Sequence, residues 1–334
     1  MAATTPSSPE PRRALITGVG GQDGGYLAEM LLSEGYVVAG LVHGEIGLAR
    51  TRALPQLRGV ELIDGDMRDR ASLERAMTRA RPTEVYNLAS FSEPSRAWTD
   101  AEASANVNSL GPLRLLEVIR GYDPRIRFVQ ASTSEIFGPR ASNPQDESVA
   151  PCPTSPYGAA KAYAHQMVGF YRERYGIFAC SAIMYNHESP RRGTQFVTRK
   201  ITRAAARIKL GLDRDVTLGS LESQRDWGYA PDFVRAMALM ARAKEPSDYV
   251  IGTGETHSVG EFLRAAFDRA GLNPDEHVTI DQSMARGANT HGLTANPARA
   301  KSVLGWIPSV TFEELVSLMV DADLEREREL SANH

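Results

Sequence analysis

Tyr157 and Lys161 stand four residues apart in the run Tyr-Gly-Ala-Ala-Lys. Residues at this spacing share one face of a helix, and a lysine ammonium beside a phenol favours the phenolate. Tyr157 is therefore expected to act as a general base near neutral pH, taking a proton from a hydroxyl while hydride leaves the same carbon. The pair follows an apolar run and lies far downstream of a glycine-rich loop, which makes the spacing more specific than the two residues alone.

Thr133 and Glu135 close another apolar run and form a second candidate group. The Thr133 hydroxyl can hydrogen-bond the reacting hydroxyl, whereas Glu135 adds a carboxyl group that simple dehydrogenation does not require. Removing water across C5 and C6 of a hexose needs a base and an acid, and one carboxyl can serve both steps. The alternatives are a helix-capping or solvated Glu135 and a Thr133 that bonds only backbone.

Gly18, Gly21 and Gly24 stand three apart, directly after a strand pattern and at the start of a helical one. In a dinucleotide site the first glycine allows a tight turn, the second lets backbone approach a pyrophosphate, and the third lets helix pack on strand. The helix N-terminus then offers N–H groups to the phosphates. We expect a nicotinamide dinucleotide here, the alternative being a glycine-rich turn without a ligand.

At the end of the second predicted strand, where an acid would hold the ribose of NAD, the chain has His43. The missing acid favours NADP, with Arg50 or Arg52 as possible phosphate partners, although Glu45 is close. Asp66, after the third strand, is placed to meet the adenine edge, and its alternative is a plain turn aspartate.

Three arginine groups follow, in residues 186–193, 199–203 and 225–228. Arginine forks suit the oxygens of a diphosphate, and in a chain of formal net charge −3 they favour an anionic substrate. About half of these arginines are expected to be solvated or paired, Arg203 first among them. No second histidine is spaced to share a metal with His187, which is expected to be structural or a polar contact to the cofactor.

Strand patterns alternate with helical ones, which predicts a parallel sheet covered by helices on both faces. The expected fold is α/β, a Rossmann-type doubly wound sheet with a smaller, intermixed C-terminal substrate domain. We assign residues 1–11 to a flexible tail, 12–185 to the dinucleotide domain and 186–330 to the substrate domain, partly interleaved with the first. The expected strands cover residues 13–17, 36–42, 60–63, 84–88, 126–131 and 178–184; the expected helices include residues 26–33, 113–119, 162–171 and 312–326.

The composition is that of a globular protein, with 334 residues, 42% hydrophobic and 24% charged. The slightly negative charge argues against nucleic acid and acidic membranes as partners. No apolar run approaches the ~20 residues that span a bilayer, and the first residues lack a signal-peptide core. Cys152 and Cys180 show neither a redox nor a metal spacing, so a cytoplasmic location is expected.

Several longer segments carry a family resemblance: ALITGVGGQDGGYLAE, STSE, SPYGAAKAYAH, YNHESPRRG, FVTRKITRA, RDWGYAPDFVRAM and LGWIPSVTFEELVSLMVDAD. Together they resemble the GDP-mannose 4,6-dehydratase family, from about residue 13 to about residue 326. The NHESPRRG and FVTRKITRA segments are the most specific, whereas the glycine loop and the tyrosine–lysine pair are common to the whole extended short-chain dehydrogenase/reductase superfamily. STSE is also similar to a segment of UDP-glucuronate decarboxylases, and 4-epimerases usually lack its glutamate.

The resemblance implies a lyase that oxidises C4 of GDP-mannose, eliminates water across C5/C6 and reduces C6 with the same NADP or, alternatively, NAD. It implies a homodimer or homotetramer and no metal. The implied catalytic residues are Thr133, Glu135, Tyr157 and Lys161. Cofactor contacts are assigned to Gly18, Gly21, Gln22, Asp23, Gly24, His43, Asp66, Met67, Leu88, Ser92, Tyr157, Lys161, His187 and Arg192. Substrate contacts are assigned to Ser92, Asn186, Val197, Lys200, Arg225 and Arg286.

The chain also departs from the family pattern. An arginine that bears on NADP is replaced near His43, and the stretch that follows, which helps to build tetramers, is shorter. Glu93-Pro94 changes a segment near the reaction centre. Residues 285–291 keep Arg286 but lose a proline and two acids of a segment that lies over the nucleotide. The alternatives are an epimerase, decarboxylase or dehydratase acting on a different nucleotide sugar and, from another class, a non-catalytic cofactor sensor.

Overall fold

The computed structural model describes residues 11–92, 96–139, 142–281, 283 and 292–332. Its centre is a seven-stranded parallel sheet, in which β1 has β2 on one side and β4 on the other. All six predicted strands are present to within two residues. The seventh, β11, was missed because it is only three residues long. In spatial order the strands are β11 (Tyr249–Ile251), β6 (Ala179–Met184), β5 (Arg127–Thr133), β4 (Glu84–Asn87), β1 (Arg13–Thr17), β2 (Val37–Val42) and β3 (Glu61–Asp64).

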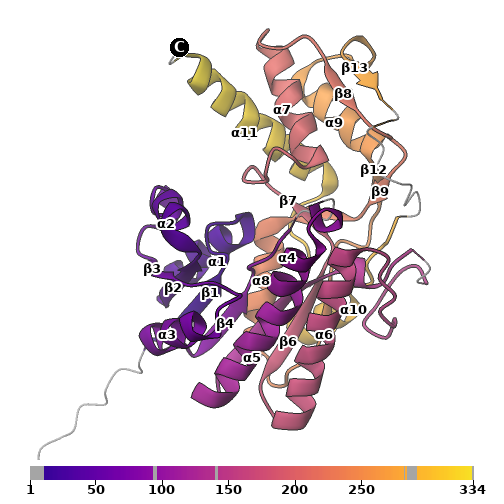
Figure 1. Cartoon of the computed structure of the whole chain (residues 1–334). Helices are drawn as coiled ribbons and strands as arrows, with labels where there is room; N and C mark the ends of the chain where they lie inside the picture. The colour runs from indigo at the N-terminus through magenta and orange to yellow at the C-terminus, as the bar shows by residue number, and fades with distance from the viewer. Residues whose placement is uncertain (1–10, 93–95, 140–141, 282, 284–291, 333–334) are drawn as a thin grey trace, which may run out of the picture.

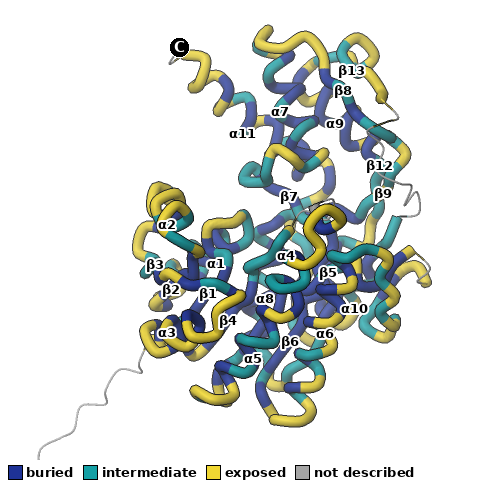
Figure 2. The backbone as a smooth tube through the Cα atoms, in the orientation of Figure 1, coloured by how far each residue is buried: buried dark blue, intermediate teal, exposed yellow. Residues whose placement is uncertain are grey.

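Helices cover both faces of this sheet, because alternate strand residues are apolar on either side. Ile16 and Val38 belong to a core shared with α1 (Gln22–Ser33) and α8 (Ala230–Arg242). Leu15 and Phe128 belong to a second core on the opposite face. This second core is shared with α3 (Arg70–Ala80), α5 (Gly111–Tyr122) and α6 (Pro156–Tyr175). Figure 2 shows the buried strands between these more exposed helices.

The strand order reverses at β1. From β1 the chain adds β2 and β3 in one direction, then crosses back and adds β4, β5, β6 and β11 in the other. Ligands of open parallel sheets bind beyond the carboxyl ends of the strands at such a reversal. The glycine loop after β1 and the ends of β4 and β5 therefore lie at the edge where a ligand is expected.

A smaller unit packs above the carboxyl edge of the sheet in Figure 1. Its core joins Ile201, Phe262 and Met319 from α7 (Val197–Lys209), α9 (Val259–Ala270) and α11 (Phe312–Ala332). Between these segments the chain returns to the large sheet with α8, β11 and α10 (Ala298–Leu304). The predicted Rossmann-type fold with an intermixed C-terminal unit is confirmed.

Shorter elements complete the described chain, and three two-stranded sheets join β7 to β10, β8 to β13 and β9 to β12. Within the described ranges, no helix combines the length and the apolar character that a bilayer crossing needs. The short elements are η1 (Pro55–Leu57), η2 (Arg96–Trp98), η3 (Asn106–Leu110), η4 (Ser134–Ile136), η5 (Pro274–Glu276), α2 (Gly44–Arg52), α4 (Ala101–Ala105), β7 (Asn186–Glu188), β8 (Val216–Leu218), β9 (Gln224–Arg225), β10 (Trp227–Tyr229), β12 (His257–Ser258) and β13 (Val278–Ile280).

Candidate active site

Tyr157 and Lys161 occupy the first two turns of α6, as their spacing predicts. Ser155 begins the helix, and its hydroxyl accepts a hydrogen bond of 3.0 Å from the Gly158 amide. The buried Lys161 ammonium donates to the Ala131 carbonyl of β5 at 3.0 Å and lies 5.8 Å from the centroid of the Tyr157 ring. The helix cap and the strand together fix both groups at the carboxyl edge of the sheet.

The Tyr157 phenol is less acidic than the sequence predicts. Burial, and then the charge of Glu135, raise its pKa to about 12, against hydrogen bonds from Ser90 and Thr133 that favour the phenolate. Burial penalises the phenolate, whereas the neighbouring hydroxyls and the Arg192 charge favour it. The role of Tyr157 as a base near neutral pH stays a prediction.

Lys161 shares its surroundings with a half-buried ion pair. Burial lowers the lysine pKa to about 8, and the Asp23 carboxylate opposes that shift. His187 Nε2 lies 2.9 Å from Asp23 Oδ2, its Nδ1 lies 2.7 Å from the Tyr185 carbonyl oxygen, and its ring stacks on Phe233. Burial disfavours the imidazolium, but Asp23 outweighs it, so the pKa of His187 is raised. His187 thus connects the helix after the glycine loop to β7.

Glu135 lies just beyond the end of β5 with an exposed side chain. Its backbone amide donates to the Thr133 hydroxyl at 3.3 Å, and the Ser155 hydroxyl lies 3.5 Å from its carboxylate. Its charge acts on Tyr157 and on Arg225. One edge of the sheet therefore holds a hydroxyl, a phenol, a carboxylate and a guanidinium together.

Arg225 and Lys200 are cations without a carboxylate partner in the described part of the chain. Arg225 donates to the Gln224 carbonyl at 2.6 Å, and burial lowers its pKa, with only Glu135 opposing that shift. Lys200 donates to the Thr217 carbonyl at 2.6 Å. Both keep positive charge that an anionic ligand can neutralise.

Other predicted anion binders are engaged in ion pairs. Arg191 pairs with Glu29, Arg199 is buried against Asp323, and Arg203 pairs with Glu327. The expectation that Arg203 is a bystander is consistent with its ion pair. Arg192 also forms an ion pair, with Glu188 at 3.1 Å, while its guanidinium covers the Phe196 ring at 3.5 Å and its charge favours the Tyr157 phenolate.

The remaining predicted substrate contacts are placed unevenly. Asn186 lies on β7 and is half-buried, and Val197 is the exposed first residue of α7. Ser92 is exposed. The side chain that hydrogen-bonds the Tyr157 hydroxyl is Ser90, which was not among the predicted site residues. A search for serines in the Asn-Leu-Ala-Ser segment after β4 would have found it. Glu93, Pro94, Arg286 and the altered residues 285–291 lie outside the described residues.

The glycine loop has the geometry that its pattern predicts. Gly18 has φ +68°, and a Cβ there would lie 2.8 Å from the Ala89 amide nitrogen. A Cβ on Gly24 would lie 2.4 Å from the Gly18 carbonyl oxygen, so the first and third roles are confirmed. No side chain caps the start of α1, which follows Gly21. Its N–H groups, beginning with Gln22, fit a phosphate.

An ion-pair cluster marks the end of β2. Arg68 binds the Asp66 carboxylate at 2.7 Å, which holds the pKa of Asp66 below its usual range. Arg68 Nη2 lies 3.4 Å from Nε2 of His43. Arg50 and Arg52 lie instead in the last turn of α2, whose first turn follows His43. Arg68 was missed, although its place two residues after Asp66 is a usable signal.

Two further predicted cofactor positions line this edge through their backbones. The Leu88 amide donates to the Thr17 hydroxyl at 3.1 Å, and the Met67 carbonyl accepts from Arg114 at 3.1 Å. Within the described residues, no group of three or more His, Cys, Asp or Glu side chains could hold a metal ion. The arrangement brings titratable side chains and the glycine loop to the same edge of the large sheet.

A family model described as GDP-mannose 4,6 dehydratase matches residues 15–319. This chain belongs to the GDP-mannose 4,6-dehydratase family. GDP-mannose 4,6 dehydratase 1 of Arabidopsis thaliana is 44% identical over 330 residues, covering 95% of this chain and 91% of that protein. The GDP-mannose 4,6 dehydratase of Homo sapiens is 42% identical over 344 residues, covering 95% and 92%.

The structural comparison leads to the same superfamily. UDP-glucose 4-epimerase of Thermus thermophilus, solved in complex with NAD, is 31% identical with a TM-score of 0.80, and the match covers 93% of this chain and 98% of that one. The family resemblance drawn from the sequence segments is confirmed. The matches with both family members span most of the length of those proteins.

Proposed function

We propose that this chain is a GDP-mannose 4,6-dehydratase, converting GDP-mannose to GDP-4-keto-6-deoxymannose and water. The observation that carries the proposal is the placement of Glu135 beside Tyr157 and Thr133. A dehydrogenase or epimerase needs the tyrosine and the threonine, whereas an acid–base carboxyl next to them suits elimination. The names of the family members support the same substrate.

The proposed reaction uses the side chains at the end of β5. A nicotinamide cofactor held at the glycine loop of Gly18, Gly21 and Gly24 would supply the redox chemistry, as acceptor of hydride from C4 and donor of hydride to C6. Thr133 orients the C4 hydroxyl while Tyr157 takes its proton. Glu135 removes the C5 proton and gives it to the C6 hydroxyl, which leaves as water. Tyr157 then returns its proton to C5, so that protons balance and both groups regain their starting state.

The substrate is proposed to lie between the two units of the fold. Arg225 and Lys200 meet the diphosphate, because both lack a carboxylate partner in the described ranges. Asn186 and Val197 flank them from β7 and α7. The half-buried Asp23–His187 pair fixes the start of α1 against β7, which positions the phosphate loop.

The proposal is tested by incubating the purified protein with GDP-mannose and analysing the nucleotide sugar by mass spectrometry. Loss of one water is expected, and Glu135→Gln should reduce its rate by about 10²- to 10⁴-fold. Glu222→Gln, an exposed acid of the smaller unit, is the matched control. Unchanged GDP-mannose, from protein that still binds cofactor, would instead favour another nucleotide sugar. If the protein keeps its function when Tyr157→Phe removes the reactive phenol, it is a non-catalytic cofactor sensor.

We propose NADP as the preferred cofactor. Two carboxylates near the end of β2 are already engaged, because Asp64 accepts from the Gly44 amide at 2.9 Å and Asp66 is bound by Arg68. The exposed Arg68 guanidinium, beside His43, suits a 2′-phosphate.

NADP and NAD affinities measured by titration test this choice. Arg68→Ser should weaken NADP binding about 10- to 100-fold, the worth of a charge-assisted hydrogen bond, and change NAD binding little. Glu45→Gln is the matched control, expected to spare NADP. Equal affinities of the unchanged protein for the two cofactors would argue against the proposal.

The assembly and location are also proposals. A homodimer or homotetramer follows from the family, and α6 exposes large apolar side chains that a second copy would cover. A cytoplasmic location is consistent with two cysteines that form no disulfide, Cys152 exposed and Cys180 buried.

A further inference from the structure

A cavity of about 710 Å³ opens at the amino ends of β1, β4 and β5, the opposite edge of the large sheet from the glycine loop. Its walls come from the starts of these strands and the ends of α3 and α8. The volume lies within the range of small-molecule sites. Its most frequent lining residue is arginine: Arg12, Arg13, Arg81, Arg125, Arg127 and Arg242.

The positive charge of this arginine-lined cavity is only partly neutralised. Arg125 pairs with Asp123 at 2.9 Å, and Arg242 pairs with Glu34. The remaining four arginines have no salt bridge to any residue that the structure describes. The chain as a whole has a formal net charge of −3, so this cluster of cations is a local positive charge in a slightly acidic protein.

Glu84 is the one carboxylate among the described lining residues, and both of its oxygens accept hydrogen bonds from hydroxyl groups. The Tyr36 and Tyr86 hydroxyls donate to its two oxygens at 3.2 and 2.6 Å. The Tyr36 hydroxyl in turn accepts from Arg12 at 3.0 Å and from Arg242 at 3.3 Å. Glu84 therefore positions Tyr36, whose hydroxyl orients two guanidiniums. None of the described arginines lies within ion-pair distance of the Glu84 carboxylate.

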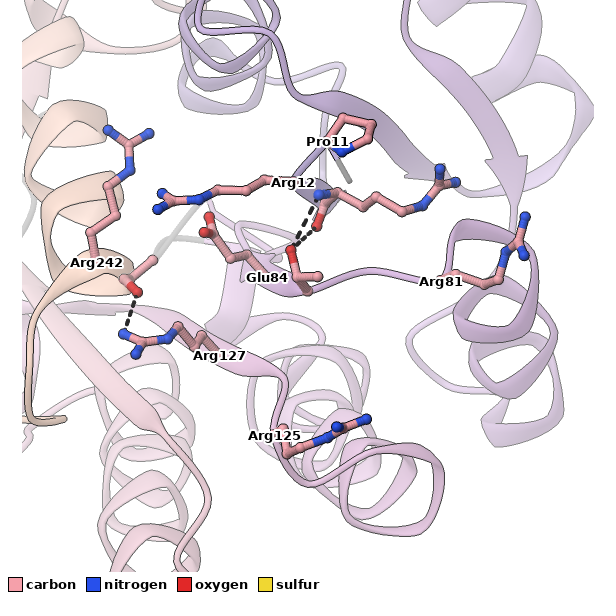
Figure 3. A pocket seen from close by; sticks show the side chains of 10 residues that line it. Pro11, Arg12, Arg81, Glu84, Arg125, Arg127 and Arg242 are labelled. Carbon is pink, nitrogen blue, oxygen red and sulfur yellow. Dashed lines mark hydrogen bonds between the residues drawn. The ribbon is translucent and has the colours of Figure 1, made fainter. Parts of the chain in front are cut away.

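Backbone carbonyls orient two more of the arginines. Arg13 Nε donates to the Ala80 carbonyl at 2.7 Å. Arg127 donates to the Ala241 and Ala243 carbonyls at 2.9 and 2.8 Å. Guanidiniums held in this way keep other N–H groups free and lose less conformational entropy when a ligand binds. Figure 3 shows Arg12, Arg127 and Arg242 around Glu84, with Arg81 on the opposite side.

We propose that this arginine-lined cavity is a second ligand site, separate from the candidate active site, which binds a small anion carrying a diphosphate group. Guanidinium forks match phosphate oxygens bidentately. Arginines on several walls suit a multiply charged group better than a single carboxylate. Free pyrophosphate and a nucleoside diphosphate share this chemistry, and the test distinguishes them.

The experiment is calorimetric titration of the full chain with pyrophosphate. Arg225→Gln serves as the background, because it weakens pyrophosphate binding at the candidate active site. The combined Arg13→Gln and Arg81→Gly changes should weaken the remaining binding about tenfold or more. Arg81 has φ +45°, a conformation that glycine adopts without strain, so folding should not suffer. Glu84→Gln should strengthen binding severalfold by removing a negative charge. Arg328→Gln, an exposed arginine on α11, is the control for the loss of a positive charge outside the cavity.

The outcomes are distinct. Binding that persists in Arg225→Gln, falls with the cavity arginines and rises with Glu84→Gln supports the site. Equal affinity of the Arg13→Gln/Arg81→Gly variant and its Arg225→Gln background, or no binding in that background, overturns it. Titration with ADP identifies the ligand class: tighter binding than pyrophosphate indicates a nucleotide, and weaker binding indicates the bare diphosphate. Thermal unfolding of each variant verifies that the fold is intact.

Discussion

Lys161 is a buried cation whose surroundings favour its neutral form. Lys161 is 3% exposed. Its ammonium is stabilised by a hydrogen bond to one carbonyl and by the more distant Asp23 carboxylate. An ordinary structural position with these properties would be apolar. A buried ammonium next to a buried phenol is instead typical of a site where charge is used in the reaction.

The Lys161→Met variant measures the energetic cost of this charge. The folded pKa of about 8 lies below the ordinary lysine value of 10.5, so the folded protein releases this proton before the unfolded chain does. At pH 7 the variant should therefore be more stable by about 1–3 kcal/mol. The advantage should shrink as pH rises from about 8 to about 10.5, because the wild type gains stability there.

Urea unfolding at pH 7, 9 and 10 tests the prediction. The exposed Lys301→Met variant is the control, for which no such pH-dependent difference is expected. A Lys161→Met protein less stable than wild type at pH 7 would mean that the ammonium is well solvated in the fold.

At the scale of elements, α7 is tied to α11 by buried charges. Asp323 is fully buried and accepts hydrogen bonds from the Arg199 guanidinium and from the Thr202 hydroxyl. Four residues further along α11, the buried Glu327 accepts from Arg203 at 2.6 Å. The C-terminal helix thus positions the helix that carries Val197 and Lys200.

Asp323→Ala should destabilise the protein by about 3–5 kcal/mol, because it leaves the buried Arg199 charge unpaired. Asp321→Ala, on the same helix, removes a half-exposed pair with Arg269 and should cost less than about 1 kcal/mol. Chemical denaturation of both variants compares them directly. Equal losses would show that the burial of the first pair contributes nothing.

At the scale of the whole molecule, α6 presents apolar side chains to solvent while its other face packs on the sheet. Tyr163 and Phe170 are 37% and 55% exposed, and their spacing of two turns places them on one face. A two-fold symmetric contact would bury this face in both copies.

Phe170→Glu should convert the expected oligomer to a smaller species by placing a charge in that contact. Light scattering after size-exclusion chromatography gives the mass of both proteins. Leu330→Glu, on the exposed side of α11, is the control for an added charge at an exposed apolar site. An unchanged mass for Phe170→Glu would exclude this face as the interface, and a monomeric wild type would exclude the oligomer.

The local features of this protein can be predicted from its sequence. The alternation of apolar runs predicts six strands, because each strand is long enough to show a pattern. The glycine spacing predicts the loop after β1, because Gly18 adopts the positive φ of its own turn and Gly24 lies against the nearby backbone of Gly18. The i, i+4 spacing of Tyr157 and Lys161 places both on one helix face, because successive turns of one helix fix their relative positions.

The partners and charge states of the side chains depend on segments that are distant in sequence. Arg199 and Arg225 look alike in sequence, but a carboxylate 124 residues further along the chain neutralises the first and none in the described ranges neutralises the second. The pKa of Tyr157 is raised because tertiary packing removes water from the phenol. The arginine-lined cavity likewise exists only where strand starts and helix ends meet, so no single segment predicts it.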